Sequence, residues 1–427
     1  MILKGKSTIS LILSIIVLVI FMISTTACTP VVRSQLSSNN DQDNNKLSGT
    51  IVFLQSYPQE YFSPELIAQY QGAINRYINK FKKLYPEVNI ILETINEADL
   101  IETIANGVSK GLSPDLIITQ SHFILPLLKV NGIIPLDQFD IDLTQFRRES
   151  IVQVLYQGKI YALPFTINTQ LLCYNKEKVL EVPKTLSELI LQARRGYSVG
   201  VLSTFDDTFW GTRIFGGRLM NSQGDLILDQ NDGWIKWIEW LKSAKNEPNF
   251  ILNEDPFALQ DAFIEGKLAY NVCWSEQIPL LRQSLGKDKF GVALLPEENE
   301  VQASPPLVSV TILLGSVSSA NQTKIALRFA QFLVNKQTQT EITNKFRSLI
   351  PANENVIFDP RLFPIQATLQ EQSRSAFTFS LDQSKKMGLI IKLGREFYTR
   401  VMAGEITPEE AARELSSNIN SIDNDNN

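Results

Sequence analysis

Strand and helix patterns alternate along the beginning of the chain, and this alternation limits the folds that it can adopt. Residues 51–54 form a short apolar run, and residues 64–84 then repeat apolar side chains at helical spacing. We expect further strands at residues 88–95 and 115–119, with a helix at residues 98–109 between them. Such alternation is typical of a mostly parallel sheet with helices on both faces. The sequence therefore predicts the α/β class.

The same alternation returns after Pro164. We expect strands at residues 171–175 and 197–202, with a helix at residues 186–194 between them. The chain has 427 residues, whereas a single hydrophobic core stops growing near about 250–300 residues. Two α/β lobes are therefore expected. Sheets of this kind bind ligands beyond the carboxyl ends of their strands.

The helix expected at residues 233–242 carries three tryptophans, Trp234, Trp237 and Trp240. Their spacing is compatible with a ladder that stacks sugar rings. They share one short helix with several aliphatic residues, however, and this favours an apolar stripe in the protein core.

The N-terminal segment has the pattern of an export signal. Two lysines precede an apolar run at residues 9–23, and small residues then lead to Cys28. The run is shorter than the roughly 20 apolar residues that a membrane-spanning helix needs. The Thr-Ala-Cys ending resembles a bacterial lipoprotein signal, although Thr25 stands where leucine is usual. We expect lipid attachment at Cys28, with an uncleaved anchor or a plain secretory signal as alternatives; each places the rest of the chain outside the cytoplasmic membrane.

Charge and composition argue against several functions. Removing residues 1–27 takes away two lysines and no acids, so the formal net charge goes from −5 to −7. This acidity is spread along the chain and gives no basic patch, so we expect no nucleic-acid partner. The single histidine, His122, leaves no His-based metal cluster and would have to serve in any Ser-His-Asp triad. We favour a place for His122 at the surface or at a helix cap, with the lining of a cleft as the alternative, and we expect no metal and no cofactor.

Two cysteines follow Cys28, and both lie in apolar runs that resemble strands. Neither Cys173 nor Cys273 has a nearby partner in a CxxC pattern. We favour buried free thiols, with a disulfide as the alternative in an oxidising compartment.

Four segments carry a resemblance to a known family. They read Pro-Asp-Leu-Ile-Ile at residues 114–118, Gly-Lys-Ile-Tyr-Ala-Leu-Pro at 158–164, Phe-Ile-Glu-Gly-Lys-Leu-Ala-Tyr at 263–270 and Lys-Ile-Ala-Leu-Arg-Phe-Ala-Gln-Phe-Leu at 324–333. In this order and spacing the chain resembles family 1 of the bacterial extracellular solute-binding proteins, which includes the maltose-binding protein.

The resemblance implies the two-lobed fold of the periplasmic binding proteins, of the type II kind. Each lobe is expected to be a mostly parallel sheet flanked by helices, and crossover strands near residues 166–170, 304–307 and 351–355 are expected to form the hinge. The expected divisions of the chain are a signal peptide at 1–27, a flexible tether at 28–49, lobe 1 at 50–166 plus 307–350, lobe 2 at 167–304 plus 351–420, and a polar tail at 421–427.

The resemblance also implies a function. The chain is expected to bind a sugar or related polyol between its lobes and to deliver it to the permease subunits of an ABC importer. It contains no G-x-x-x-x-G-K-S/T phosphate loop, so another subunit would supply the energy. We expect a lipid-anchored monomer in the periplasm or another extracytoplasmic space, and not an enzyme. The alternatives are a receptor for a signalling kinase and a secreted glycoside hydrolase that uses Asp207 and Glu276.

Sugar sites combine flat aromatic faces with polar groups that pair with hydroxyls. From the strand ends and the resemblance, Gln120 and Asn168 stand where the maltose-binding protein has acids, which argues against maltose itself as the ligand. The candidate ligand-binding residues are Tyr57, Gln120, Asn168, Gln170, Asp207, Trp210, Trp274 and Glu276.

Overall fold

The computed structural model describes residues 46–59, 62–221 and 225–425. Residues from Leu47 onward form one compact unit. The expected signal peptide, Cys28 and most of the expected tether lie outside the described residues. None of the described helices is both long enough and apolar enough to cross a bilayer.

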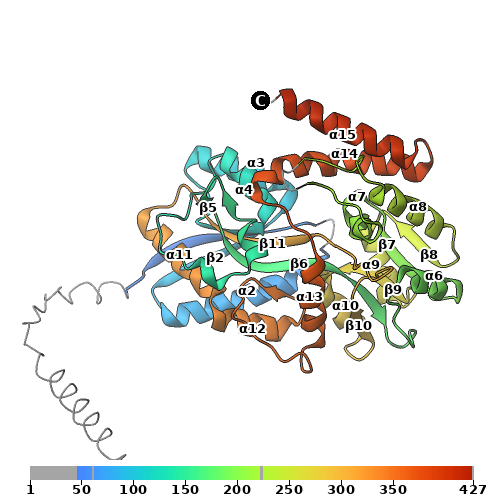
Figure 1. The fold of residues 1–427 in the computed structure, drawn as a ribbon. Coiled ribbons are helices and arrows are strands. Elements are labelled where there is room, and N and C mark those ends of the chain that lie inside the picture. Colours follow the sequence, from blue (N-terminus) through green and yellow to red (C-terminus); the bar gives the residue numbers. More distant parts are fainter. Residues whose placement is uncertain (1–45, 60–61, 222–224, 426–427) are drawn as a thin grey trace, which may run out of the picture. The chain divides into compact units, whose positions relative to one another are not determined.

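A ten-stranded sheet runs through this unit, and its longest strand joins the two halves (Figure 1). This strand is β6, Leu163–Asn175. The strands follow the spatial order β2-β1-β3-β11-β6-β9-β7-β8, and β10 and β12 also pair with β6. The bounds of these strands are Gly49–Tyr57 for β1, Val88–Asn96 for β2, Leu116–Gln120 for β3, Val199–Leu202 for β7, Phe250–Asn253 for β8, Tyr270–Trp274 for β9, Phe290–Ala293 for β10, Leu307–Leu314 for β11 and Ile350–Pro351 for β12.

The first lobe is built on three parallel strands, β2, β1 and β3, and β11 runs antiparallel beside β3. Its core contains a cluster of aromatic rings. The ring centroids of Phe81 and Phe329 lie 5.0 Å apart, and those of Phe329 and Phe53 of β1 lie 5.7 Å apart. Edge-on ring pairs of this kind add to the free energy of burial. The main helices here are α2 (Pro64–Leu84), α3 (Leu100–Lys110), α4 (Ile124–Lys129), α11 (Ala320–Val334) and α12 (Lys336–Phe346).

The second lobe repeats the plan, with β8, β7 and β9 parallel and β6 antiparallel to both β9 and β10. Trp234 and Trp237 are 1% and 0% exposed in its core, which confirms the expected apolar stripe. The helices of this lobe are α6 (Leu186–Arg194), α7 (Phe205–Thr208), α8 (Gly233–Lys245), α9 (Pro256–Ile264), α10 (Ile278–Leu285), α13 (Pro364–Ser375), α14 (Ser384–Ala403) and α15 (Pro408–Asp425).

The chain passes between the lobes along β6. Residues 163–169 of this strand pair with β11, and residues 170–174 pair with β9. A second passage precedes β11, where the Leu307 N–H donates to the Phe377 carbonyl oxygen at 2.8 Å. The predicted two-lobed α/β fold is confirmed, with antiparallel strands added to the parallel ones in each lobe. The residue boundaries of the lobes stay a prediction.

Cys173 and Cys273 form a disulfide, with their Cα atoms 5.9 Å apart. The preference for free thiols was therefore wrong. In the antiparallel pair of β6 and β9, Leu171 lies opposite Cys273. Cys173 is two residues from Leu171, so both sulfur atoms lie on the same face of the sheet at diagonal positions. Nothing in the local sequence reveals this register.

Candidate ligand-binding site

The two lobes enclose a cavity of about 640 Å³. Its lining includes Leu307 and Val308 at the start of β11, so the cavity lies where the chain passes from one lobe to the other. The first lobe contributes Glu97, Gln120, His122, Leu125 and Lys129, and the second contributes Asp206, Asp207, Trp274, Glu276, Met387, Ile391 and Arg395. We call this cavity the cleft.

Trp274 enters the cleft from the last position of β9 and is only partly buried. Its indole Nε1 donates a hydrogen bond of 2.9 Å to the Asp207 carboxylate. The other oxygen of Asp207 accepts a bond of 2.8 Å from the hydroxyl of Thr204, the residue that caps α7. The plane of the Trp274 ring is therefore fixed by a carboxylate that is itself held in place.

Gln170 does not line the cleft. Its side-chain amide donates at 3.0 Å to the backbone carbonyl of Asp207 and at 3.4 Å to the carboxylate. This candidate therefore lies behind the wall of the cleft, where it supports Asp207.

Glu276 and Asn168 meet in the cleft, where the Asn168 amide donates to the Glu276 carboxylate. Glu276 belongs to the single turn at residues 275–277 that follows β9, whereas Asn168 lies in the middle of β6. Burial, and then the negative charges of Glu97 and Asp207, raise the pKa of Glu276 to about 8. Near neutral pH a large fraction of Glu276 is therefore protonated and able to donate a hydrogen bond to a ligand.

The Asp207 carboxyl group is also a weaker acid than an ordinary aspartate side chain. Burial, and then the neighbouring Asp206, raise the pKa of Asp207 to about 6, against the lowering effect of its hydrogen bonds from Trp274 and Thr204. Asp206 pairs with Arg395 of α14 through two contacts of 2.7 Å. Two carboxyl groups with different proton affinities thus face one cleft.

Gln120 and His122 form part of the first-lobe wall. Gln120 ends β3, and His122 follows it in a short turn. The His122 imidazole lies 3.4 Å from a carboxylate oxygen of Glu97. The His122 side chain is exposed, as favoured from the sequence, and it also lines the cleft, which was the alternative.

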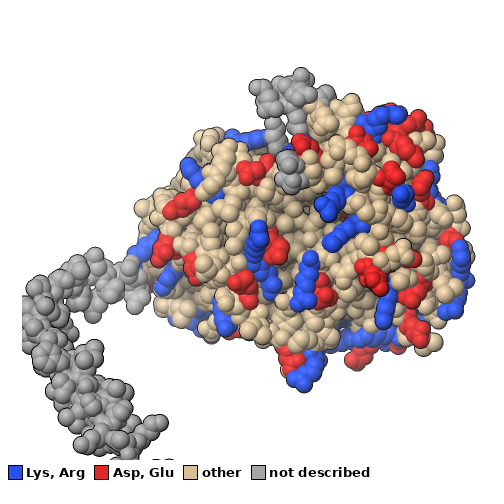
Figure 2. Space-filling view, in the orientation of Figure 1, with Lys and Arg blue, Asp and Glu red and all other residues tan. Residues whose placement is uncertain are grey.

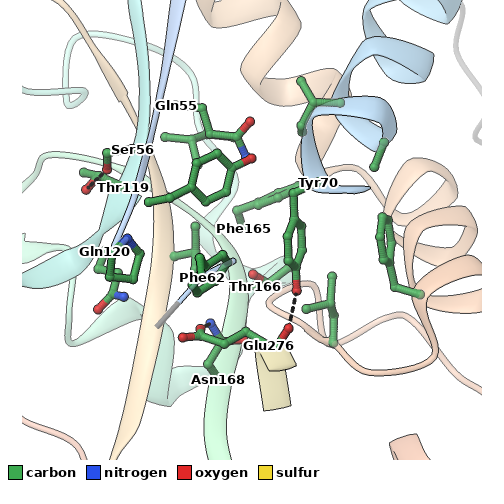
Figure 3. Close-up of a pocket in the computed structure, with 18 of the residues that line it drawn as sticks. Gln55, Ser56, Phe62, Tyr70, Thr119, Gln120, Phe165, Thr166, Asn168 and Glu276 are labelled. Atoms are coloured by element: carbon green, nitrogen blue, oxygen red, sulfur yellow. Dashed lines mark hydrogen bonds between the residues drawn. The ribbon is translucent and has the colours of Figure 1, made fainter. Parts of the chain in front are cut away.

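Tyr57 lines a second, smaller cavity of about 70 Å³, which we call the side pocket (Figure 3). It lies beside the ends of β1 and β3, next to α2. Its lining shares five residues with that of the cleft: Pro58, Glu97, Gln120, Asn168 and Glu276. The two cavities are therefore neighbours along one wall.

Trp210 contributes to neither cavity, so this candidate is corrected. It is 1% exposed and packs edge-on against Trp237, with ring centroids 4.8 Å apart. The short helical turns after α7 point the side chain at residue 210 into the lobe rather than into the cleft. Only the preceding residues of that segment, Asp206 and Asp207, reach the cleft.

One wall of the cleft was not predicted from the sequence. Phe377 and Phe379 precede α14, and Met387, Ile391 and Arg395 lie on it. The alternation Phe-Thr-Phe at residues 377–379 was the available signal, because it places two aromatic rings on one face of an extended segment. Among the described residues no cluster of His, Cys, Asp and Glu has the arrangement of a metal site.

Residues 76–362 match the family of bacterial extracellular solute-binding proteins. The match covers more than half of the chain, and the chain belongs to this family of binding proteins.

Two curated relatives come from Bacillus subtilis. The chain is 23% identical over 283 residues to its galactooligosaccharide-binding protein, over 61% of this chain and 66% of the relative. It is 25% identical over 233 residues to its maltodextrin-binding protein MdxE, over 48% of this chain and 54% of the relative. The aligned part therefore spans less than two thirds of each relative.

Solved structures share the fold. The GacH receptor of Streptomyces glaucescens, solved unliganded and with acarbose, has a TM-score of 0.75 at 21% identity, covering 87% of this chain and 97% of the receptor. The maltose-maltodextrin binding protein of Alicyclobacillus acidocaldarius has a TM-score of 0.72 at 17% identity, covering 87% and 100%.

Proposed function

We propose that the protein binds a sugar or related polyol in the cleft and delivers it to the permease of an ABC importer. The observation that carries this proposal is the pair of Trp274 and Asp207. An aromatic face fixed beside a carboxylate offers one surface for the C–H side of a sugar ring and one acceptor for its hydroxyls. The relatives named for galactooligosaccharide and maltodextrin binding support a carbohydrate as the ligand.

The wall made by Phe377 and Phe379 supports the same ligand class. Their ring centroids lie 5.2 Å apart, and both residues line the cleft. Several aromatic surfaces in one large cavity suit a ligand of more than one ring. Glu276, Asn168 and Gln120 add three polar groups, namely a carboxyl group and two amides.

A ligand that contacts both lobes favours their closed arrangement only by its differential affinity for the closed and open states. The closed form would then be recognised by the permease, and ATP hydrolysis would occur on another subunit. The protein would act as a monomer, anchored outside the cytoplasmic membrane by a lipid on Cys28. On the face drawn in Figure 2, acidic and basic side chains are interspersed. This mixture agrees with the expectation that nucleic acid is not a partner.

Two alternative functions would use the same cleft. A sensing receptor would bind the same sugar but pass its closed form to a kinase. A glycoside hydrolase would cleave the sugar with Glu276 as acid, and the raised pKa of Glu276 is the observation in its favour. The hydrogen bonds that occupy Asp207 weigh against its use as the second catalytic group.

A thermal-shift screen against a carbohydrate panel tests the proposal, since a ligand of the native state stabilises it by RT ln(1 + [L]/Kd). We expect at least one sugar to raise the melting temperature in a dose-dependent way. Chromatography of the same sugar after long incubation should return it intact. Cleavage products would support the hydrolase, and a panel without any shift would contradict carbohydrate binding.

A further inference from the structure

We propose that a second site, a basic pocket between the lobes, binds a small oxyanion with two or more negative charges and thereby stabilises the closed arrangement. This pocket has a volume of about 630 Å³ and shares no lining residue with the cleft. We call it the basic pocket. The inference goes beyond the proposed function, and only its last step, the coupling to sugar binding, rests on that function.

Both lobes contribute to the basic pocket. Figure 1 shows α2, α12 and α10 next to one another in the lower middle of the molecule, where the lobes meet. The side chains of Gln69 on α2 and Gln283 on α10 line the pocket and are joined by a hydrogen bond of 2.7 Å. A ligand in this pocket can therefore contact both lobes at once. Its charged side chains are Arg76 and Lys345 from the first lobe, and Arg282 and Lys287 from the second.

The positive charges of the basic pocket are not neutralised. No acidic side chain lines it, and none of its four cations forms a side-chain hydrogen bond or an ion pair with a described residue. Burial, and then the charge of Arg76, lower the pKa of Lys345. Burial, and then the charge of Arg347, lower the pKa of Arg282 against the opposite effect of Asp288. The cations therefore repel one another, and a bound anion would offset this repulsion.

The charged groups can be reached from solvent. Arg76, Lys287 and Lys345 are exposed, and Arg282 is half-buried. Gly72 lines the same space, and a Cβ atom there would meet no other part of the protein within 4 Å. Glycine in the middle of a helix lowers stability relative to alanine. At this position it leaves room beside the cations.

The number and kind of the cations define the class of ligand. The guanidinium groups of Arg76 and Arg282 can pair with two oxygen atoms at once, and lysine adds a compact charge. Four positive charges suit an anion that carries several negative charges, whereas chloride or acetate would neutralise only one. The volume lies within the range of about 300–1,000 Å³ that is usual for small-molecule sites. A multivalent oxyanion of the phosphate or carboxylate kind meets these conditions.

Basic residues near helix ends also have a structural role. Arg282 and Lys345 lie in the last turns of α10 and α12, where positive charge complements the helix dipole. This role does not account for Arg76, which lies in the middle of α2. It also does not account for the meeting of four cations from two lobes at one pocket.

Contacts lead from the basic pocket to the cleft. Phe346 lines the basic pocket, and its ring stacks on that of Tyr70 with centroids 5.6 Å apart. The Tyr70 hydroxyl donates at 3.1 Å to the backbone carbonyl of Glu276, which lines the cleft. An anion that contacts both lobes and a sugar that contacts both lobes favour the same closed state. Each must then raise the affinity of the other by the same factor.

Titration calorimetry with pyrophosphate on the sugar-free protein tests the site, at an ionic strength held constant with NaCl. We expect saturable binding. Arg76→Gln and Arg282→Gln should each weaken it about tenfold, because each removes hydrogen bonds to a charged group. Lys82→Gln is the matched control, since Lys82 is an exposed cation of α2 that does not line the basic pocket, and it should leave the affinity unchanged. Citrate, titrated in the same way, distinguishes the ligand kinds: the tighter of the two identifies a phosphate or a carboxylate ligand.

The absence of saturable binding of both anions would overturn the site and leave the sugar proposal intact. Pyrophosphate binding that Arg76→Gln and Arg282→Gln do not weaken would overturn it as well.

The coupling has its own measurement. Saturating pyrophosphate should raise the affinity for the best sugar of the panel about fivefold or more, and Arg76→Gln should abolish this gain. An unchanged sugar affinity would contradict the stabilisation of the closed arrangement. If no sugar binds, the proposed function fails, but the titration of the sugar-free protein still decides the anion site. Small-angle X-ray scattering with pyrophosphate alone then decides the closure: a smaller radius of gyration supports it, and an unchanged radius overturns it.

Discussion

The Trp274 indole donates to the Asp207 carboxylate at 2.9 Å. Trp274 ends β9 and Asp207 lies on α7, so this bond joins two elements that are 67 residues apart in the chain. Both residues line the cleft. The bond fixes an aromatic face and an acceptor beside each other, which is the arrangement that a sugar ring requires.

Trp274→Ala is expected to weaken sugar binding at least tenfold, about 1.4 kcal/mol, because it removes the stacking face and releases Asp207. Titration calorimetry with the best sugar of the panel measures the change. Trp210→Phe is the matched control: it alters a tryptophan of the core, so it should lower the melting temperature without changing affinity. Unchanged binding in the Trp274 variant would remove this residue from the site.

Phe379→Ala is expected to weaken the same sugar about fivefold, since an aromatic contact in a protein contributes about 1 kcal/mol beyond its buried area. Phe377 has a second role, because its backbone bonds to Pro305 and Leu307 at the passage between the lobes. Phe377→Ala should therefore reduce stability as well as affinity. Melting curves and calorimetry on both variants separate these effects. Full affinity in the Phe379 variant would exclude this wall from the site.

Stability should fall as the pH rises from about 4.5 to about 8. The pKa of Glu276 is raised from 4.5 to about 8 by burial and then by Glu97 and Asp207. The folded state therefore binds more protons than the unfolded state in this interval, and the free energy of unfolding decreases with pH. Each pKa unit corresponds to about 1.4 kcal/mol.

Glu276→Gln removes the charge and keeps the shape of the side chain. This variant should be more stable than the native protein at pH 8.5, and its unfolding free energy should depend less on pH. Urea unfolding at a series of pH values measures both. Parallel curves for the native protein and the variant would show that Glu276 is not the group that titrates.

The disulfide between Cys173 and Cys273 closes a loop with a sequence separation of 100 residues. Because a cross-link restricts the unfolded chain, its loss should cost about 2–4 kcal/mol. The double variant C173A/C273A should melt at a lower temperature than the native protein. A reductant should lower the melting temperature of the native protein and leave that of the variant unchanged. A reductant-sensitive variant would contradict this account.

The alternation of strands and helices was readable from the sequence because each element has its own period. The helix expected at residues 186–194 has these bounds in the structure, where Thr185 and Glu188 form a capping box. Helices α13 and α14 went unrecognised. No strand lies between them to mark their limits.

The site was less accessible to sequence analysis. Trp274 and Glu276 reach the cleft because they follow the carboxyl end of a strand, which the pattern predicts. Trp210 follows a strand too, but a short turn of helix rotates it into the core. Gln170 points toward Asp207 rather than into the cleft. The direction of a side chain in a loop depends on tertiary packing, which local periodicity does not encode.

Closure of the two lobes around a sugar is the central claim, and small-angle X-ray scattering tests it most directly. The purified protein should be measured with and without the tightest-binding sugar of the panel, and with a sugar that gives no thermal shift. We predict that the radius of gyration decreases with the binding sugar and stays unchanged with the sugar that gives no thermal shift. An unchanged radius at a concentration that saturates binding would contradict the account.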